Sequence, residues 1–262
     1  MELRLKKIFL PLYVGIFCIF LYLPIIILTM YSFNKGGFPA QWTGASFCWY
    51  YELFHSVEIW RAFQNSVTVA ISSACLSVLL GLMLVYGAKK MRTKVSYFFY
   101  SNILVPDIAI AVGMLSLFSY FMIPLGVITL IIGHTLLGLG FTIPILKARL
   151  DELDHRLVEA SLDLGASSWY TFRHVVMPFL YPAILVSTLL VMIVSFDDFV
   201  ISFFCAGSSA QTLSLYVFTM IRSGISPTVN ALSTIMLLIS SFFVLAISLL
   251  QARLAAHDEK IS

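Results

Sequence analysis

Residues 159–178 read EASLDLGASSWYTFRHVVMP and span the second half of a charged loop and the start of a long apolar run. From Asp151 onward, apolar residues recur at spacings of four, three and four, which is typical of one face of an α-helix. Gly165 ends this helix, because a residue with positive φ is commonly needed there, and a serine at 167 or 168 caps a second short helix. Pro178 then opens the apolar run, so the stretch predicts a helix–glycine–helix elbow. On the pattern alone, this elbow is either a solvent-exposed connector or an element that docks a partner. The apolar face consists of Leu153, Leu157, Ala160 and Leu164.

The composition of the whole chain places it in a membrane. Of its 262 residues, 60% are apolar and only 11% are charged. An average soluble domain carries about a quarter charged residues, so a water-facing surface could not be made from this composition. A soluble globular enzyme, a disordered chain and a fibrous repeat are therefore excluded.

Charge-free runs predict the membrane spans, because a helix needs about 20 apolar residues to cross the hydrocarbon core. The run 108–146 is too long for one crossing, and the Ile-Pro-Leu-Gly turn at 123–126 splits it. The run 199–221 is broken by the polar stretch 206–212, so we expect this run to form a re-entrant or interfacial segment. The chain is therefore predicted to be an all-α membrane protein. We expect one transmembrane domain over 1–262, with six transmembrane helices near 8–31, 63–87, 97–122, 127–147, 177–198 and 230–251 and a cytoplasmic loop at 148–176.

The placement of Lys and Arg predicts the orientation, because basic loops resist translocation across the membrane. The N-terminal segment, the loops 88–96 and 147–176 and the C-terminal tail together hold 13 of the 16 basic residues. Only Lys35, Arg61 and Arg222 fall on the other side. Both termini are therefore expected in the cytoplasm, and the net charge of +3 reflects this bias, with no sign of a nucleic-acid surface.

Three acidic residues fall at or near membrane depth. Asp107 lies about ten residues into the third expected span, and the adjacent Asp197 and Asp198 lie near the outer end of the fifth. A carboxylate there is costly unless it faces water, a partner or a substrate. Phe196 and Phe199 flank the acidic pair, and carboxylates beside aromatic rings suit an organic polycation. These five residues are the candidate substrate path. For the three acids, the alternatives are helix capping after a proline, an ion pair between subunits and an interfacial position.

The remaining candidates carry weaker signals. His134 in the fourth span is either a hydrogen-bonded packing residue, which we favour, or a proton relay. Cys48 and Cys205 fall in outer segments, where isolated small apolar side chains are favoured over a disulfide. The aromatic segment 32–60 is typical of the membrane interface, with a protein-docking surface as the alternative. The sequence contains no G-x-x-x-x-G-K-[ST] loop, no metal-spaced Cys/His cluster and no catalytic motif, so we expect no cofactor and no enzymatic activity in this chain.

The elbow closely resembles the EAA loop of the inner-membrane permease subunits of bacterial ABC importers, whose pattern is E-A-A-x3-G-x9-I-x-L-P. Glu159, Gly165 and Pro178 stand at the expected spacing, in a loop before the penultimate span. The conservative departures are Ser161 for Ala, Val175 for Ile and Met177 for Leu. In the family this helix couples the permease to its ATPase. The resemblance therefore implies these ATPase-coupling residues: Glu159, Ala160, Ser161, Asp163 and Gly165.

A second resemblance, over nearly the whole chain, is to the second permease of spermidine/putrescine importers. It is based on short landmarks that are distributed from residue 31 to residue 232. The landmarks are Tyr31-Ser32-Phe33-Asn34, Trp49-Tyr50, Pro106-Asp107, Ser195-Phe196-Asp197-Asp198 and Ser226-Pro227-x-Val229-Asn230-Ala231-Leu232.

These resemblances imply the type I ABC importer permease fold, in a multi-pass subunit of a bacterial inner membrane. The expected partners are a homologous second permease, two ATPase subunits that bind ATP and Mg, an external substrate-binding protein and membrane lipid. The expected function is ATP-driven import of a small cationic substrate, a polyamine, by alternating access. Two alternatives are an ABC permease for another small organic solute and an ion-coupled secondary carrier that uses Asp107 or His134 as a proton site.

Overall fold

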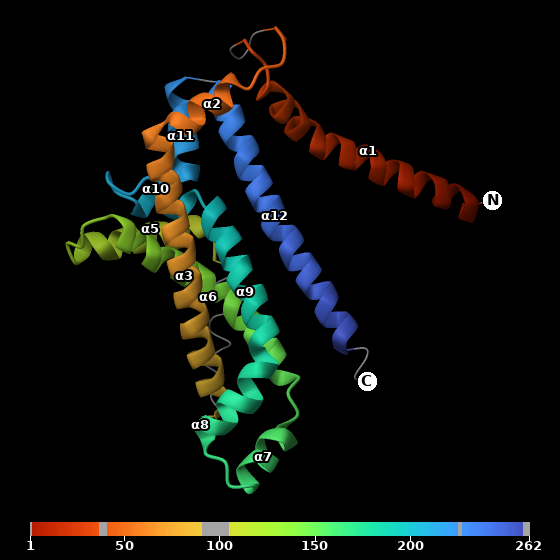
Figure 1. Cartoon of the computed structure of the whole chain (residues 1–262), viewed down its shortest axis with the longest axis vertical. Helices are drawn as coiled ribbons and strands as arrows, with labels where there is room; N and C mark the ends of the chain where they lie inside the picture. Colours follow the sequence, from red (N-terminus) through yellow and green to blue (C-terminus); the bar gives the residue numbers. More distant parts are fainter. Residues whose placement is uncertain (1, 37–40, 91–104, 225–226, 259–262) are drawn as a thin grey trace. The chain divides into compact units, whose positions relative to one another are not determined.

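The computed structural model describes residues 2–36, 41–90, 105–224 and 227–258. Regular structure in these ranges is helical, apart from one isolated bridge between Asn34 and Ala45 (Figure 1). The helices are α1 (Glu2–Tyr31), α2 (Cys48–His55), α3 (Val57–Lys90), α5 (Asp107–Tyr120), α6 (Val127–Asp151), α7 (His155–Asp163), α8 (Ser168–Thr171), the π-helical turn η2 (Phe172–Val176), α9 (Met177–Asp197), α10 (Val200–Cys205), α11 (Leu213–Ser223) and α12 (Pro227–Asp258). The chain forms two compact units, Met1–Trp60 with Val217–Ile239 and Arg61–Tyr216 with Ser240–Ser262.

The first unit contains α1, α2 and a loop that is ordered around Asn34. The Asn34 side-chain oxygen accepts from the backbone N–H of Thr43 at 2.9 Å, and the Asn34 carbonyl accepts from Nε1 of Trp49 at 2.7 Å. The hydroxyl oxygens of Ser32 and Tyr50 lie 2.7 Å apart. Several large aromatic side chains of this segment stay exposed, as either a membrane interface or a docking surface requires. They are Trp42, Phe47, Tyr51, Phe54 and Trp60.

The second unit is organised around α6, which packs against α9 and α10. Small residues on α6 permit this close approach. A Cβ atom at Gly138 would collide with the Ser77 hydroxyl of α3 and would lie 2.7 Å from Val191 Cγ1 of α9. A Cβ atom at Gly133 would lie 2.7 Å from Ile201 Cγ2 of α10. Because helices in lipid associate mainly through van der Waals contact, these glycines position α6 at the centre of the unit.

Two apolar clusters lie toward the two ends of α6. One cluster joins α5, α6 and α10, and the other joins the end of α3, the end of α6 and the start of α9. The second cluster also includes Leu153, so it reaches the loop that carries the predicted elbow. The elbow is thus attached to a buried apolar core. Fully buried members include Phe118, Leu130 and Ile201 in the first cluster and Leu146, Val176 and Leu180 in the second.

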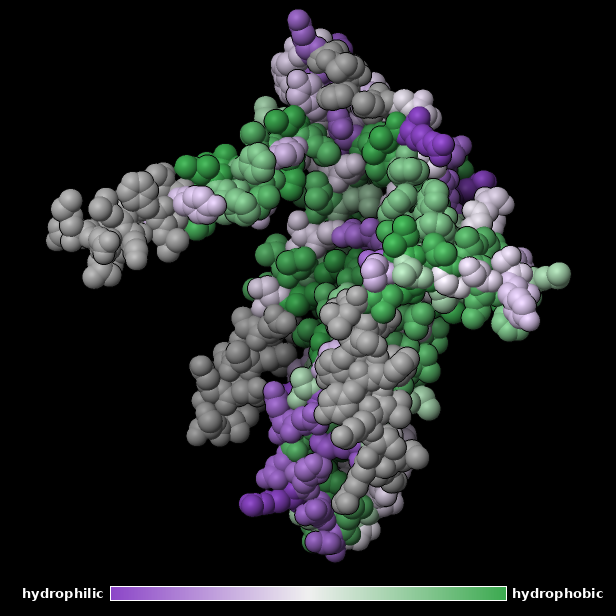
Figure 2. Space-filling model, turned by 180° about the vertical axis from the view of Figure 1, so that it is seen from behind, coloured by the Kyte–Doolittle hydropathy of each residue, from purple (hydrophilic) through white to green (hydrophobic). Residues whose placement is uncertain are grey.

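Five helical segments in the described residues are long and apolar enough to cross a membrane. They match the first, second, fourth, fifth and sixth expected spans, and α6 and α9 begin at the expected residues, Val127 and Met177. Figure 2 shows hydrophobic side chains over much of the visible helical surface, while hydrophilic side chains gather at the end that carries α7. The segments are Tyr13–Tyr31, Val57–Lys89, Val127–Asp151, Ser168–Asp197 and Pro227–Leu249.

The third expected span, 97–122, lies partly outside the described residues. The expectation of one helix through this range is wrong at Pro106, whose ψ of 134° is not helical. Proline lacks an N–H and disfavours helical backbone at the residue before it, so it favours an interruption at this position. The described helix α5 begins at Asp107, so this residue lies at the start of a helix and not within a continuous one.

The expected helix from Asp151 also begins later than predicted. α6 continues to Asp151 and α7 begins at His155, because the Asp154 side chain accepts from the backbone N–H of Arg156 and caps the new helix. Leu153 consequently belongs to the buried cluster at the end of α6, and the face predicted for α7 loses this residue. The segment 199–221, expected to be re-entrant or interfacial, contains α10, the polar stretch 206–212 and most of α11.

Candidate functional site

The elbow comprises residues 155–176, and two polar side chains define where its helices start. The Asp154 carboxylate accepts from the backbone N–H of Arg156 at 2.9 Å. The Ser167 hydroxyl accepts from the backbone N–H of Tyr170 at 3.2 Å, which identifies the predicted serine cap of the second helix. Side-chain acceptors at these positions satisfy amides that the first turn of a helix leaves unpaired.

Gly165 makes the sharp turn between α7 and α8. Its φ of +86° lies in the left-handed region, so the predicted glycine break is confirmed. The N–H groups of Gly165 and Ala166 donate to the carbonyls of Leu162 and Ser161 at 2.9 and 3.1 Å. This pair of hydrogen bonds is the Schellman motif, which closes the end of a helix.

The elbow is joined to the transmembrane helices by specific contacts. The hydroxyl oxygens of Ser161 in α7 and Thr171 in α8 lie 2.9 Å apart, so the two arms of the elbow are linked. The ring of Phe172 lies 4.7 Å from the ring of Tyr86 near the end of α3. Packed aromatic side chains therefore connect the elbow to α3, and η2 leads directly into α9.

Large apolar side chains are exposed on the elbow, although this loop is otherwise polar. Leu164 is 89% exposed and Trp169 is 68% exposed. Scattered apolar residues on a surface are normal, but a group of them on a short charged loop indicates an interaction site. The group consists of Leu157, Leu162, Leu164, Trp169 and Tyr170.

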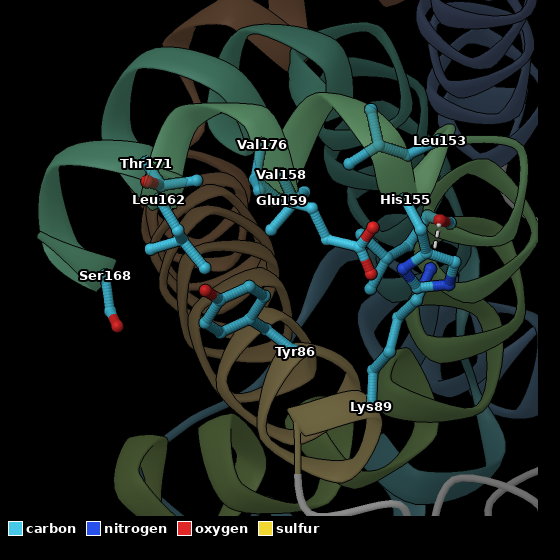
Figure 3. Close-up of a pocket in the computed structure, with 11 residues that line it drawn as sticks. Tyr86, Lys89, Leu153, His155, Val158, Glu159, Leu162, Ser168, Thr171 and Val176 are labelled. Carbon is cyan, nitrogen blue, oxygen red and sulfur yellow. Dashed lines mark hydrogen bonds between the residues drawn. The ribbon is translucent and has the colours of Figure 1, made fainter. Parts of the chain in front are cut away.

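Glu159 lies beside a cavity of about 410 Å³ between the elbow and the ends of α3 and α6. Figure 3 shows its carboxylate turned toward the same part of the cavity as Lys89 and His155. The Lys89 amine donates to the carbonyl of Leu150 at 2.7 Å. Glu159 itself is exposed, so a side chain of a partner can reach it. Ala160 and Asp163, which were predicted with it, are also exposed, and Ser161 is half-buried.

The second candidate site is the break between α9 and α10, where two of the predicted acids lie. α9 ends at Asp197, and Asp198 is extended with a ψ of 127°. The Asp198 carboxylate accepts from the backbone N–H of Ser202 at 3.0 Å, and the Asp198 carbonyl accepts from the Ser214 hydroxyl at 2.6 Å. Only 6% of its side chain is exposed.

Asp197 and Asp107 differ from Asp198 because their side chains are exposed. The Asp197 carboxylate accepts from the Ser240 hydroxyl of α12 at 2.9 and 3.0 Å. Asp107 begins α5, which packs against α10, and its carboxylate interacts electrostatically with that of Asp198. Among the described residues, none of the three acids pairs with Lys or Arg. The structure therefore brings Asp107 close to the acidic break.

The two predicted aromatic residues occupy different surroundings. Phe196 is only 5% exposed and packs edge-to-face on Phe63 of α3, with ring centroids 6.4 Å apart. Phe199 is half-buried, and its ring lies 5.5 Å from that of Phe203. Phe199 is thus the more accessible of the two for a substrate, and the role of both rings stays a prediction.

A buried polar cluster beside the break was not foreseen as a unit. His134 has no exposed side-chain surface; its Nδ1 lies 2.6 Å from Ser195 Oγ, and its Nε2 lies 3.5 Å from an Asp198 carboxylate oxygen. The favoured reading of His134 as a hydrogen-bonded packing residue agrees with these contacts. Ser195, Asp198 and Ser202 follow one another at helical spacing, which is the signal that could have suggested the cluster.

The helical fold and the elbow define the class of protein as a membrane permease subunit. Residues 2–257 match the family described as "Binding-protein-dependent transport system inner membrane component", and the chain belongs to this family. It is 36% identical over 225 residues to the spermidine/putrescine transport system permease protein PotC of Haemophilus influenzae, covering 84% of this chain and 88% of the relative. It is 31% identical over 229 residues to the putrescine transport system permease protein PotI of Escherichia coli K12, covering 83% and 82%.

Solved structures support the same fold. A bacterial ABC transporter that imports the acidic polysaccharide alginate aligns with a TM-score of 0.71 and 18% identity, over 96% of each chain. The MetNI methionine ABC transporter in an inward-facing conformation aligns with a TM-score of 0.58 and 19% identity, over 73% of this chain and 94% of the other. At these identities the likeness concerns the fold alone.

Proposed function

We propose that this chain is the transmembrane permease subunit of an ATP-driven ABC importer for polyamines. Its family supplies the class of transporter, and its relatives include spermidine/putrescine and putrescine permeases. The observation that carries the substrate class is the pair of exposed acids beside the α9–α10 break, Asp107 and Asp197, which have no Lys or Arg partner in the described part of the chain. Such a group suits a ligand with several positive charges.

The proposed topology has six crossings with both termini in the cytoplasm. Five helical segments are long enough to cross, and α5 with the residues before it would supply the remaining crossing. The distribution of basic residues supports this orientation, because 13 of 16 fall in segments on one side. It also places the elbow in the cytoplasm, where an ATPase can reach it.

The elbow is the proposed contact with the ATPase subunits. Glu159, Ala160 and Asp163 are exposed on α7, beside the apolar group that includes Leu164 and Trp169. Two ATPase subunits would bind ATP and Mg, and their closure would move the elbow as a rigid body. A homologous second permease would complete the cavity, and an external binding protein would deliver the substrate.

The substrate path is proposed to include Asp107, Asp197 and Phe199, which are the accessible members of the predicted set. A carboxylate can pair with an ammonium group, and a ring can contact the cation or the methylene spacer between two charges. Phe196 and Asp198 belong to the same predicted set, but their side chains are buried within the protein.

Uptake of labelled spermidine by proteoliposomes that contain the complete importer tests the substrate class. Unlabelled spermidine and putrescine should compete, and Asp197→Asn should raise the half-saturating concentration about tenfold, because a charged interaction is lost. Glu52→Gln, at an exposed acid in α2, is the matched control and should have no effect. If another solute competes and neither polyamine does, polyamines are not the substrates of this importer.

A further inference from the structure

The break between α9 and α10 leaves main-chain groups that need partners, because helical hydrogen bonding stops there. Asp198 supplies hydrogen-bond acceptors at this break from both its side chain and its backbone. Its carboxylate accepts from the N–H of Ser202 at 3.0 Å. Its carbonyl accepts from the Ser214 hydroxyl at 2.6 Å. One residue thus connects the end of α9, the first turn of α10 and the start of α11.

His134 supports this arrangement from α6. Its Nε2 lies 3.5 Å from the Asp198 carboxylate and 3.4 Å from the Ser202 hydroxyl, while its Nδ1 lies 2.6 Å from the Ser195 hydroxyl. The Ser73 hydroxyl of α3 donates to the Ser195 hydroxyl at 3.4 Å. Every member of this cluster is buried or nearly so, and buried polar groups hold their geometry only when they are hydrogen-bonded.

The two adjacent acids therefore have different capacities for a ligand. The Asp198 carboxylate is buried, with only 6% of its side chain exposed. It accepts from the Ser202 amide and lies 3.5 Å from the His134 imidazole, so little of it is open to a ligand. Asp197 is exposed and accepts from the Ser240 hydroxyl, a neutral partner that a cationic ligand can displace or share. Asp197 is the last residue of α9 and Asp198 has extended backbone, and the two differ in burial: Asp197 is exposed, whereas only 6% of the Asp198 side chain is exposed.

We infer that Asp198 and His134 are positioning residues, which hold the α9–α10 break so that Asp197 faces the substrate path, and that Asp198 does not itself bind the polycation. This inference rests on the proposed function. According to this inference, the charge of Asp197 recognises the substrate, and the hydrogen-bond acceptors of Asp198 maintain the geometry of the site.

Substitutions that separate charge from hydrogen bonding test the inference in proteoliposomes that contain the complete importer. The half-saturating concentration of spermidine is measured together with the amount of assembled complex. Asp198→Asn keeps an oxygen that accepts from α10, so the half-saturating concentration should stay within about twofold of the original. Asp198→Ala removes every acceptor and should raise it about tenfold. Asp197→Asn should also raise it about tenfold, because there the charge is required.

His134 is tested in the same assay. His134→Leu removes the polar contacts and should raise the half-saturating concentration, while His134→Gln keeps an amide for hydrogen bonding and should restore most of the affinity. The double variant His134→Leu/Asp198→Ala should be no worse than Asp198→Ala alone, since the two residues act as one unit.

Three results would overturn the inference. An increase with Asp198→Asn as large as that with Asp197→Asn would show that the Asp198 charge contacts the substrate. Less assembled complex with Asp198→Ala, at an unchanged half-saturating concentration, would leave Asp198 with a folding role only. Additive effects of the His134 and Asp198 variants would show that the two residues act independently. Failure of the proposed function is distinct, because the unsubstituted importer would then take up no spermidine and no half-saturating concentration could be measured.

Discussion

The ring of Phe172 lies 4.7 Å from the ring of Tyr86, and this contact joins the elbow to the end of α3. Phe172 also stacks on Trp169, with ring centroids 5.6 Å apart, so three aromatic side chains connect the exposed elbow to a transmembrane helix. Aromatic pairs contribute about 0.5–1.5 kcal/mol beyond the area that they bury. A rigid connection of this kind is what a mechanical link between an ATPase and a membrane helix requires.

Replacing Phe172 with Ala should therefore uncouple the importer. The ATPase can still bind the elbow, but movement of α7 is no longer passed to α3, so the amount of substrate imported per ATP hydrolysed should fall about two- to thirtyfold. Tyr86→Phe is the matched control, because it keeps the ring and should leave the ratio unchanged. Substrate uptake and ATP hydrolysis are measured in parallel. An unchanged amount of substrate imported per ATP hydrolysed for Phe172→Ala would show that this contact has no role in coupling.

Gly165→Ala should disturb the elbow without any steric clash. A Cβ atom at Gly165 would meet nothing within 4 Å, but its φ of +86° disfavours any L side chain by about 1–2 kcal/mol. The angle between α7 and α8 should shift, and uptake should fall although the complex assembles. Gly87→Ala is the control, since this glycine also has open space and has no positive φ. Equal loss of uptake in both variants would show that strain at Gly165 is not the cause.

Leu164→Asp should weaken the contact with the ATPase subunits and leave the permease folded. Leu164 is 89% exposed, and substitutions at such positions usually change stability by less than about 0.5 kcal/mol. Ser208→Asp adds the same charge to an exposed turn outside the elbow and serves as the control. Co-purification of the ATPase with each tagged variant is the measurement. Full recovery of the ATPase with Leu164→Asp would place the docking surface elsewhere.

The membrane helices were predictable because the signals that define them are local. Charge-free runs located five crossings, and the Gly165 break and the Ser167 cap followed from backbone preferences of single residues. The start of α7 was misplaced because the periodic apolar pattern continued across Asp154, whose capping bond outweighs it. Hydropathy alone likewise did not show that α5 begins after Pro106, which lacks an N–H for helical hydrogen bonding.

The acidic site could be predicted only in part, because its geometry depends on contacts between distant segments. Sequence identified Asp107, Asp197 and Asp198 as costly charges at membrane depth. It could not show that Asp198 turns inward, since that depends on a contact with His134, 64 positions earlier in the chain. Nor could spacing show that Asp197 would meet Ser240 of α12.

The energy source of transport tests the central claim most directly. Proteoliposomes that contain the chain with its partner permease and ATPase subunits, and the binding protein loaded with labelled spermidine, are compared with proteoliposomes that contain the chain alone under a pH gradient. An ABC permease subunit should support uptake only in the complete complex and only with ATP on the ATPase side. Uptake by the chain alone, driven by the pH gradient and unaffected by ATP, would contradict the proposal and identify an ion-coupled carrier.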